Sequence, residues 1–359
     1  MIAFLKGKYR ILKGINTYLT KIVFRKSNDI DNAKLIFFDL NHNRFERYFY
    51  LLCKFYLLEG YQIGIKVNFT FLGNLERYSA LLLEEKNVRF FWKSQNARIS
   101  FHTDPNQRNG TFISDDYFRK PSLSSYHIPM SQHPLMYHDN FWNQSLPSEV
   151  INRAIFFAGS LEKGQYDKEE MNILFGVYNR VQLANFLQNT ISWFPIENQS
   201  QLNDRILDKI VFLDREIINI SMPDLRQVIK NFRYYMACPG VSMPFSHNVI
   251  EAMSVGSIPI IEEKYADLFE PRLIHLENSL VFSHSEKSLE DVIDLAFRLN
   301  ENELNRLSQN VLAYYNNNLT PKKVIDTIFK QINSTFYLNA EAFSVKYLSN
   351  NSLPLKKGD

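Results

Sequence analysis

The 359-residue chain contains only two cysteines, Cys53 and Cys238, and neither belongs to a Cys-x-x-Cys pair. Two isolated cysteines supply neither a disulfide framework nor a zinc site. Disulfides persist mainly in oxidising compartments. The cysteine content therefore agrees with a reducing compartment, and we expect a cytoplasmic protein.

Long apolar runs are also missing. No stretch of 18 or more uncharged apolar residues occurs, and a helix needs about 20 such residues to cross a bilayer. The sequence also lacks the Gly-x-Gly-x-x-Gly, Walker, His-Glu-x-x-His and Gly-x-Ser-x-Gly patterns. It therefore gives no direct sign of the sites that these motifs build.

What is present is the composition of a folded protein. Hydrophobic residues make up 45% of the chain and charged residues 22%, and aromatic residues reach 14%. A chain of this kind buries a large core, which excludes disorder as its main state. Its length predicts two or three domains.

Charge is distributed unevenly. The net charge is +3, but residues 1–28 carry seven bases and no acid, and the rest is mildly acidic. The bases alternate with apolar residues at helical spacing, so we expect a basic amphipathic segment over 1–30. Either this helix lies on an anionic membrane surface, or it packs on its own protein with its bases in water. A mildly acidic body argues against nucleic acid as a partner. The seven bases are Lys6, Lys8, Arg10, Lys13, Lys21, Arg25 and Lys26.

The rest of the chain alternates between strand and helix patterns. Strands are predicted at 34–39, 61–67, 88–92, 153–158, 209–213, 233–238 and 257–261, and helices at 43–59, 74–86, 168–189, 223–231, 246–255, 287–299, 301–315 and 321–333. Such alternation indicates parallel sheets with covered faces. We expect an α/β protein with two Rossmann-like, doubly wound domains facing a cleft. Their expected ranges are 31–150 and 151–335, followed by a tail over 336–359.

The most informative segment is 234–261. A strand ends at Cys238, Pro239 and Gly240 turn the chain, and Ser246 is placed to cap the following helix. A helix that begins after a strand favours anions at its start. Glu251 lies one turn along, on the same face as His247 and Asn248. Its carboxylate could accept hydrogen bonds from a ribose diol, or it could lie on the solvated face of a plain βαβ unit.

This segment resembles the donor-nucleotide half of glycosyltransferases with the GT-B fold, most closely the exostosin-like branch. The matching residues are Cys238-Pro239, Glu251-Ala252 and Gly256-Ser257-Ile258-Pro259-Ile260-Ile261. The resemblance implies that Glu251 binds the donor nucleotide, commonly through its ribose. It also implies that the loop 240–248 covers the diphosphate or the donor sugar, and that the first domain lies on the acceptor side.

Three positions depart from the family pattern. Gly240 stands where a basic residue is usual, Asn248 where Arg is frequent, and Met243 where many relatives carry an acid. A cation for the diphosphate must therefore come from elsewhere. The loop with Gly159, Ser160 and Lys163 follows a strand and is one source, unless Lys163 is only a solvated loop lysine. Arg226 and Lys230 share a helix face and are a second source, unless they are a surface pair.

Transfer to an acceptor hydroxyl with inversion needs a general base. Asp39 ends the first strand and His42 follows in its loop, and both are candidates. Alternatively, Asp39 or Asn41 only caps the helix 43–59. Asp104 and His133 are further candidates for the base. The Asp29-Ile30-Asp31 pattern precedes a strand instead of following one, so we expect no metal site there.

These observations predict a glycosyltransferase. We expect it to be metal-independent and to move a sugar from a UDP- or GDP-linked donor to a glycan or lipid-linked glycan in cell-surface polysaccharide synthesis. The segment 1–28 would hold it at the inner face of the membrane. The alternatives are a nucleotide-sugar epimerase and a non-catalytic nucleotide-sugar-binding subunit.

Overall fold

The computed structural model describes residues 2–24, 30–107, 109–147, 152–332 and 334–352. The expectations for Arg25, Lys26 and Asp29 lie outside these residues. The chain forms two compact units. Unit 1 comprises Met1–Ile128 and Pro321–Asp359, and unit 2 comprises Pro129–Thr320.

Unit 1 is built on a seven-stranded parallel sheet in the order β3-β2-β1-β4-β5-β12-β6. The order 3-2-1-4-5 is that of a Rossmann half. Phe38 on β1 packs against Phe49 and Phe101, with ring centroids 5.0 and 5.1 Å away. The strands are β1 Leu35–Asp39, β2 Gln62–Lys66, β3 Val88–Phe91, β4 Ile99–His102, β5 Thr111–Ser114, β6 Ser125–His127 and β12 Thr335–Tyr337.

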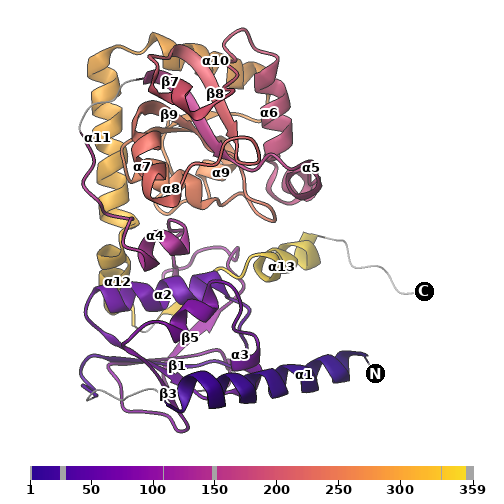
Figure 1. The fold of residues 1–359 in the computed structure, drawn as a ribbon, viewed down its shortest axis with the longest axis vertical. Helices are drawn as coiled ribbons and strands as arrows, with labels where there is room; N and C mark the ends of the chain where they lie inside the picture. Colours follow the sequence, from indigo (N-terminus) through magenta and orange to yellow (C-terminus); the bar gives the residue numbers. More distant parts are fainter. Residues whose placement is uncertain (1, 25–29, 108, 148–151, 333, 353–359) are drawn as a thin grey trace. The chain divides into compact units, whose positions relative to one another are not determined.

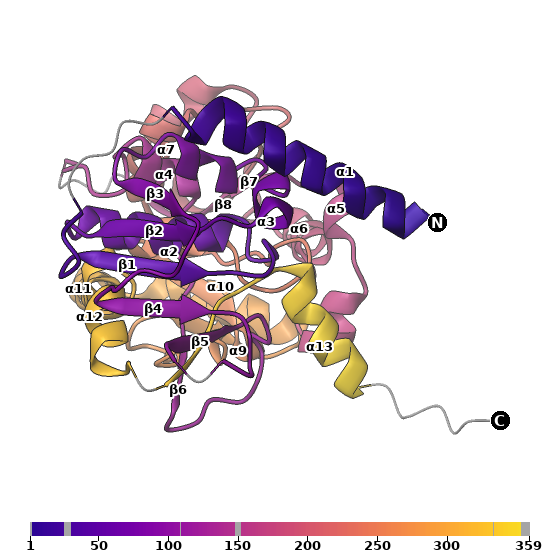
Figure 2. The same ribbon diagram turned by 90° about the horizontal axis from the view of Figure 1, so that it is seen from below.

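The helices of unit 1 lie on both sides of this sheet. Helices α2 and α12 contact one another on one side, and α1 lies on the opposite side (Figures 1 and 2). Phe329 of α12 packs on Tyr56 of α2, with ring centroids 6.1 Å apart. The helices are α1 Ile2–Thr17, α2 Arg47–Leu58, α3 Phe69–Gly73, α12 Pro321–Lys330 and α13 Ala342–Ser352, with short helical turns η1 Tyr18–Ile22 and η2 Ser79–Leu83.

Unit 2 is built on a five-stranded parallel sheet in the order β11-β10-β9-β7-β8. Numbered from β7, this is the order 2-1-3-4-5 of flavodoxin-like proteins. Phe156 and Phe232 stack in its core, 4.4 Å apart. The strands are β7 Asn152–Gly159, β8 Leu207–Asp214, β9 Phe232–Met236, β10 Ile258–Glu262 and β11 Leu280–Phe282.

Helices also surround the sheet of unit 2. Helix α7 contacts α8, and α11 packs on α8, whereas α6 and α10 line a common cavity of about 470 Å³. The helices are α4 Pro134–His138, α5 Lys163–Tyr166, α6 Arg180–Gln188, α7 Met222–Lys230, α8 His247–Met253, α9 Glu263–Ala266, α10 Glu286–Arg298 and α11 Glu301–Asn318, with turns η3 Met171–Phe175 and η4 Gln199–Asn203. The expected α/β class with two doubly wound, Rossmann-like units is confirmed.

Two predicted helices were wrong in their extent. The helix predicted over 168–189 is divided into η3 and α6, because Gly176 adopts the left-handed conformation (φ 62°) and Asn179 starts a new helix with a capping box. The helix predicted over 74–86 is replaced by α3 and η2, because Asn68 caps a short helix that ends at Asn74.

The domain boundaries lie elsewhere than expected. Residues 129–150 were assigned to the first domain, yet Gln132 donates to the hydroxyl of Tyr315 (2.7 Å), which ties this segment to unit 2. Residues 321–335 were assigned to the second domain, yet α12 covers α2, and β12 pairs with β5 and β6. Unit 1 is therefore completed by the end of the chain.

None of the helices within the described residues has the length and apolar character needed to span a membrane.

Candidate functional site

The sheet of unit 2 has its topological switch point between β7 and β9. The chain leaves β7 toward β8 on one side, and the later strands are added on the other. Ligands of doubly wound sheets bind outside the carboxyl ends of the strands at such a point. The segments that emerge there are Gly159-Ser160 after β7 and Cys238-Pro239-Gly240 after β9.

Arg180, the first residue of α6, bridges these two segments. Its Nε and Nη2 donate to the carbonyl oxygen of Pro239 (3.0 and 2.7 Å), and its Nη1 donates to that of Ser160 (3.0 Å). The ring of Tyr166 lies 3.8 Å from the guanidinium carbon. Only 4% of Arg180 is exposed, and no carboxylate pairs with it among the described residues. Within the described residues, a buried cation with carbonyl and aromatic partners but no carboxylate thus occupies the switch point.

Two predicted glycines, Gly159 and Gly240, lie close to neighbouring atoms at the switch point. A Cβ on Gly159 would lie 2.8 Å from the Phe157 ring and 3.4 Å from Nη1 of Arg180. A Cβ on Gly240 would lie 2.7 Å from the Phe245 carbonyl oxygen. Both positions bring the backbone so close to its neighbours that a side chain larger than that of glycine would force them to shift.

The start of α8 is bonded to the surrounding structure. Ser246 occupies the N-cap position, but its side chain makes no capping bond, and its N–H donates to the hydroxyl of Tyr265 (3.0 Å). Asn248 donates through Nδ2 to the carbonyl oxygen of Ala158 (2.6 Å). Asn248 therefore ties the helix to the end of β7.

Glu251 is fully buried, so the alternative of a solvated face is wrong. Its Oε1 accepts from the backbone N–H of His133 (3.0 Å) and lies 3.1 Å from Nδ1 of His247. Its Oε2 has no hydrogen-bond partner among the described residues. His133, expected beside the acceptor, instead belongs to unit 2, with its ring 4.9 Å from that of His247. The structure thus brings three predicted residues together, and the ribose contact of Glu251 stays a prediction.

A second cluster lies at the carboxyl ends of β10 and β11. Glu262 accepts from the backbone N–H of Tyr178 (2.8 Å) and bonds Nδ1 of His284. The rings of Tyr178 and His284 stack, with centroids 4.1 Å apart. Burial raises the pKa of Glu262, although the bond with His284 opposes this shift. Tyr178 is two residues before Arg180 in the chain. The stacked rings of Tyr178 and His284 and the buried guanidinium of Arg180 therefore belong to the same edge of the sheet.

The predicted cations have different surroundings. Lys163 begins α5 and is exposed. Arg226 is buried, and it donates to Ser254 Oγ (3.1 Å) and to the carbonyl oxygens of Phe141 and Gln144 (both 3.1 Å). Lys230 donates to the carbonyl oxygen of Leu146 (3.3 Å).

Arg226 and Lys230 are therefore not a surface pair, because carbonyl oxygens of the segment 141–146 bind both side chains, and their contact with a diphosphate stays a prediction. Helix α7 leads into the first residue of β9, so its last turn lies at the amino ends of the strands, away from the expected ligand edge. Burial lowers the pKa of both groups. Their role is to hold the segment 141–146 on α7.

The sheet of unit 1 has its own switch point, between β1 and β4. Asp39 ends β1 and is in register with His102, which ends β4. Oδ2 of Asp39 lies 2.6 Å from Nζ of Lys66, at the end of β2. His102 is buried, and neither ring nitrogen has a hydrogen-bond partner among the described residues. A carboxylate and an imidazole thus end two neighbouring strands where a ligand of this unit is expected.

The other predicted bases are engaged locally. His42 Nδ1 accepts weakly from the N–H of Arg44 (3.4 Å), and burial together with Arg44 lowers its pKa. Asp104 accepts from the N–H of Asn106 (2.9 Å) in a turn. The alternative that Asp39 or Asn41 caps the helix predicted over 43–59 is wrong, because this helix is α2 and its N-cap is Glu46.

Four residues of these clusters were not predicted from the sequence: Arg180, Tyr178, His284 and His102. The first two were hidden because one long helix was predicted across 168–189. His102 was missed because no strand was predicted over 99–102, so nothing in the sequence placed it at the end of β4. Among the described residues, no three His, Cys, Asp or Glu side chains gather as a metal site. Independence from metal ions stays a prediction.

Comparison with known proteins finds no matching family model and no matching curated protein. Among solved structures, the chain is similar to HepE of Anabaena, described in complex with UDP (TM-score 0.43, 12% identity, 83% of this chain and 99% of that one). It is also similar to a glycosyltransferase of Rickettsia africae (TM-score 0.45, 11% identity, 90% and 100%). A third is the N-terminal domain of a trehalose-6-phosphate phosphatase of Candida albicans (TM-score 0.44, 8% identity, 86% and 98%). Similarity this remote does not establish an activity.

Proposed function

We propose that the protein is a GT-B-type glycosyltransferase that binds the diphosphate of a nucleotide-sugar donor at the β7–β9 switch point of unit 2. The observation that carries this proposal is the buried guanidinium of Arg180, which has carbonyl partners but no carboxylate among the described residues. Buried charges in proteins are normally paired or bound to a ligand. A nucleoside diphosphate supplies the missing negative charge.

The same cation suits the chemistry of transfer. The departing nucleoside diphosphate gains negative charge, and fixed cations and N–H groups stabilise that charge most where water is excluded. Arginine presents several donors in a planar fork that matches phosphate oxygens. With Arg180 in this role, the proposal requires no metal ion.

Three neighbouring groups complete the proposed donor site. The ring of Tyr166 covers Arg180, so we propose that the segment 161–167, which includes Lys163, moves aside when the donor enters. The stacked rings of Tyr178 and His284 offer an apolar platform for the nucleobase. Oε2 of Glu251, buried without a partner among the described residues, is assigned to a ribose hydroxyl, for which His133 and His247 would have to shift.

The acceptor is assigned to the carboxyl edge of the sheet in unit 1. A general base that takes the proton of the acceptor hydroxyl needs a free ring nitrogen or carboxylate oxygen. Neither ring nitrogen of His102 has a hydrogen-bond partner within the described residues, so the unprotonated nitrogen of the neutral ring meets this requirement, and Asp39 is in register beside it. Because the ring is buried, it would have to become accessible when the acceptor binds. We therefore place His102 ahead of His42 and Asp104 as the base.

The acceptor class that we propose is a glycan or lipid-linked glycan of cell-surface polysaccharide synthesis, acted on in the cytoplasm. This part rests on the resemblance of residues 238–261 to the exostosin-like branch.

The proposal is tested with the full-length protein in a thermal-shift screen against UDP, GDP, CMP and dTDP. A ligand that binds only the folded state raises the melting temperature in proportion to its excess over the dissociation constant. We expect one nucleoside diphosphate to stabilise the protein and its parent nucleoside to have little effect. The proposal fails if no diphosphate binds. Incubating the matching nucleotide sugar with and without glycan acceptors then distinguishes transfer from epimerisation and from binding alone.

A further inference from the structure

Helix α1 packs against the rest of unit 1 through a face that carries glycine in place of large side chains. A Cβ on Gly14 would lie 1.9 Å from the carbonyl oxygen of Phe69, and one on Gly73 would lie 1.9 Å from that of Arg10. The backbones of α1 and α3 are therefore in direct contact. Tyr18, just after α1, accepts a hydrogen bond from Nε1 of Trp92 (2.8 Å). These contacts fix which side of α1 faces outward.

The outward side is apolar. Along α1 and η1 the exposed fractions are 58% for Leu5, 69% for Tyr9, 65% for Leu12 and 55% for Leu19, followed by 47% for Val23. Their spacing of three, four or seven residues places them on one helical face. We call these five residues the apolar stripe. A row of large apolar side chains in water marks an interaction surface.

Basic side chains flank the apolar stripe. Residues 1–28 contain no acid. Lys13 pairs with Glu76 (2.8 Å), whereas Lys6 and Arg10 have no ion-pair partner among the described residues. The sequence left open whether this helix packs on its protein or lies on a membrane. The structure shows that packing uses the glycine face and leaves the apolar and basic faces exposed.

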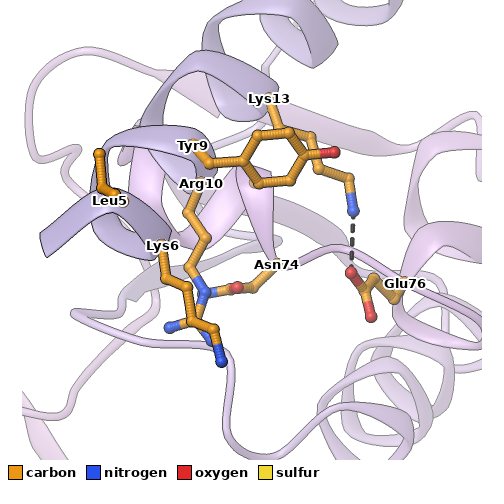
Figure 3. Close-up of a pocket in the computed structure, with 8 residues that line it drawn as sticks. Leu5, Lys6, Tyr9, Arg10, Lys13, Asn74 and Glu76 are labelled. Carbon is orange, nitrogen blue, oxygen red and sulfur yellow. Dashed lines mark hydrogen bonds and ion pairs between the residues drawn. The ribbon is translucent and has the colours of Figure 1, made fainter. Parts of the chain in front are cut away.

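A cavity of about 410 Å³ lies beside the stripe, between α1 and the chain after α3 (Figure 3). Lys6, Arg10 and Lys13 line it from the helix, together with Leu5 and Tyr9 of the stripe. In Figure 3 the side chain of Arg10 extends toward Asn74 on the opposite wall, and the side chain of Lys6 lies beside that of Arg10. Since a water molecule takes about 30 Å³ in the liquid, the cavity has ample room for a phosphate group.

We propose that α1 binds the surface of a membrane that contains anionic lipids. The apolar stripe enters the boundary between headgroups and acyl chains, and the cavity takes the phosphate of an anionic lipid. A helix with one apolar face and basic flanks binds anionic bilayers in this way. A second copy of the chain fits less well, because a symmetric contact would bring two sets of unbalanced bases together. This inference goes beyond the proposed function and does not depend on it.

The test is sedimentation of the full-length protein with vesicles of phosphatidylcholine alone or of phosphatidylcholine mixed with phosphatidylglycerol. We expect sedimentation only with the mixed vesicles, weakened by added salt. The double variants Leu5→Ser/Leu12→Ser and Lys6→Gln/Arg10→Gln should each lower vesicle affinity at least about tenfold. The changed side chains are exposed, so the melting temperature should stay the same.

Matched controls are Leu123→Ser and Lys120→Gln, which change exposed residues elsewhere in unit 1 and should bind vesicles like the unchanged protein. Equal sedimentation with both vesicle types, no sedimentation, or equal losses in the controls would overturn the proposal. Ultracentrifugation without vesicles would also overturn it by showing a dimer that dissociates into monomers in Leu5→Ser/Leu12→Ser. The apolar stripe would then bind a second copy of the chain.

Discussion

The two units share a fold class but present different chemistry at the carboxyl edges of their sheets. In unit 2 the switch point holds a buried cation, Arg180, bonded to two carbonyl oxygens. In unit 1 it holds a carboxylate, Asp39, and a buried imidazole, His102, whose ring nitrogens are unpaired within the described residues. The first set can bind an anion, and the second can take a proton.

This difference shows that the fold determines where a site lies, whereas the side chains there determine which chemistry it can perform. A doubly wound sheet offers a crevice at its switch point whatever the sequence. Which ligand enters depends on the few groups that emerge there. The two edges can therefore be tested separately, because a change in one should leave the property of the other intact.

The largest effect is expected at the edge of unit 1. His102→Gln keeps a polar side chain of similar size but removes the proposed base, and general-base catalysis is worth about 10²–10⁴-fold. We expect turnover to fall by about 100-fold while the dissociation constant of the donor stays the same. Initial rates and calorimetry measure the two quantities.

Asp104→Asn is the matched control for His102, because asparagine keeps the oxygen that accepts from Asn106. Its turnover should change little. If Asp104→Asn lost as much activity as His102→Gln, the assignment of the base to His102 would be wrong.

The next effect concerns the edge of unit 2. Arg180→Met removes the charge-assisted hydrogen bonds to the diphosphate, each worth about 1.5–3 kcal/mol, so donor affinity should fall about 10–100-fold. The change also leaves the carbonyl groups of Ser160 and Pro239 without this partner, and the melting temperature must be followed. Arg180→Lys keeps the charge and should have intermediate affinity.

Arg298→Met is the control for Arg180, because Arg298 is an exposed arginine of the same unit that ends helix α10, away from the switch point. It should bind the donor like the unchanged protein. Equal losses in both variants would mean that net charge, and not the switch point, controls binding.

A smaller effect is expected for Glu251→Gln. Glutamine can keep the acceptor that bonds the His133 N–H, while its amide replaces the unpaired Oε2. Loss of one hydrogen bond from ribose to a carboxylate, at the lower end of the range for charged groups, should weaken donor binding about tenfold. Calorimetry with the nucleoside diphosphate measures this change, and unchanged affinity would remove Glu251 from the donor site.

The smallest effect is a pH dependence from His42. Burial and the charge of Arg44 lower its pKa in the folded protein below the usual 6.5. Between the lowered value and 6.5, the unfolded chain binds more protons than the folded one, so the free energy of unfolding decreases as the pH falls through this window. Denaturant unfolding measures the free energy of unfolding from about pH 7.5 to about pH 5.5. This free energy should decrease less for His42→Gln than for the unchanged protein. An identical decrease would exclude His42 as its cause.

Much of the fold could be predicted because strand–helix alternation is a local signal. The ends of strands such as 34–39 and 209–213 were predicted within two residues. The strand predicted to end at Cys238 ends two residues earlier, and Ser246 is the N-cap of α8 as predicted. The non-local parts could not be predicted. Strand β12 pairs with β5 and β6, which lie more than 200 residues earlier in the chain. No local sequence pattern identifies the strands with which it pairs.

The site was predicted only where the chain itself carries the pattern. Gly159, Gly240 and Asn248 lie where expected, because each follows a strand or starts a helix. Arg180 was missed because its position depends on the break at Gly176, which a long helical pattern conceals. The carboxylate of Glu251 accepts from the N–H of His133, which is 118 residues away in the chain and which the sequence assigned to the other domain.

The most direct test of the central claim is amide hydrogen–deuterium exchange of the full-length protein with and without the nucleoside diphosphate that binds best. The claim is that an anionic donor binds at the switch point of unit 2. It predicts slower exchange on binding in residues 159–167, 178–182 and 238–248, with unit 1 unchanged in the absence of acceptor. Protection confined to any other region, or no protection with the ligand bound, would contradict it.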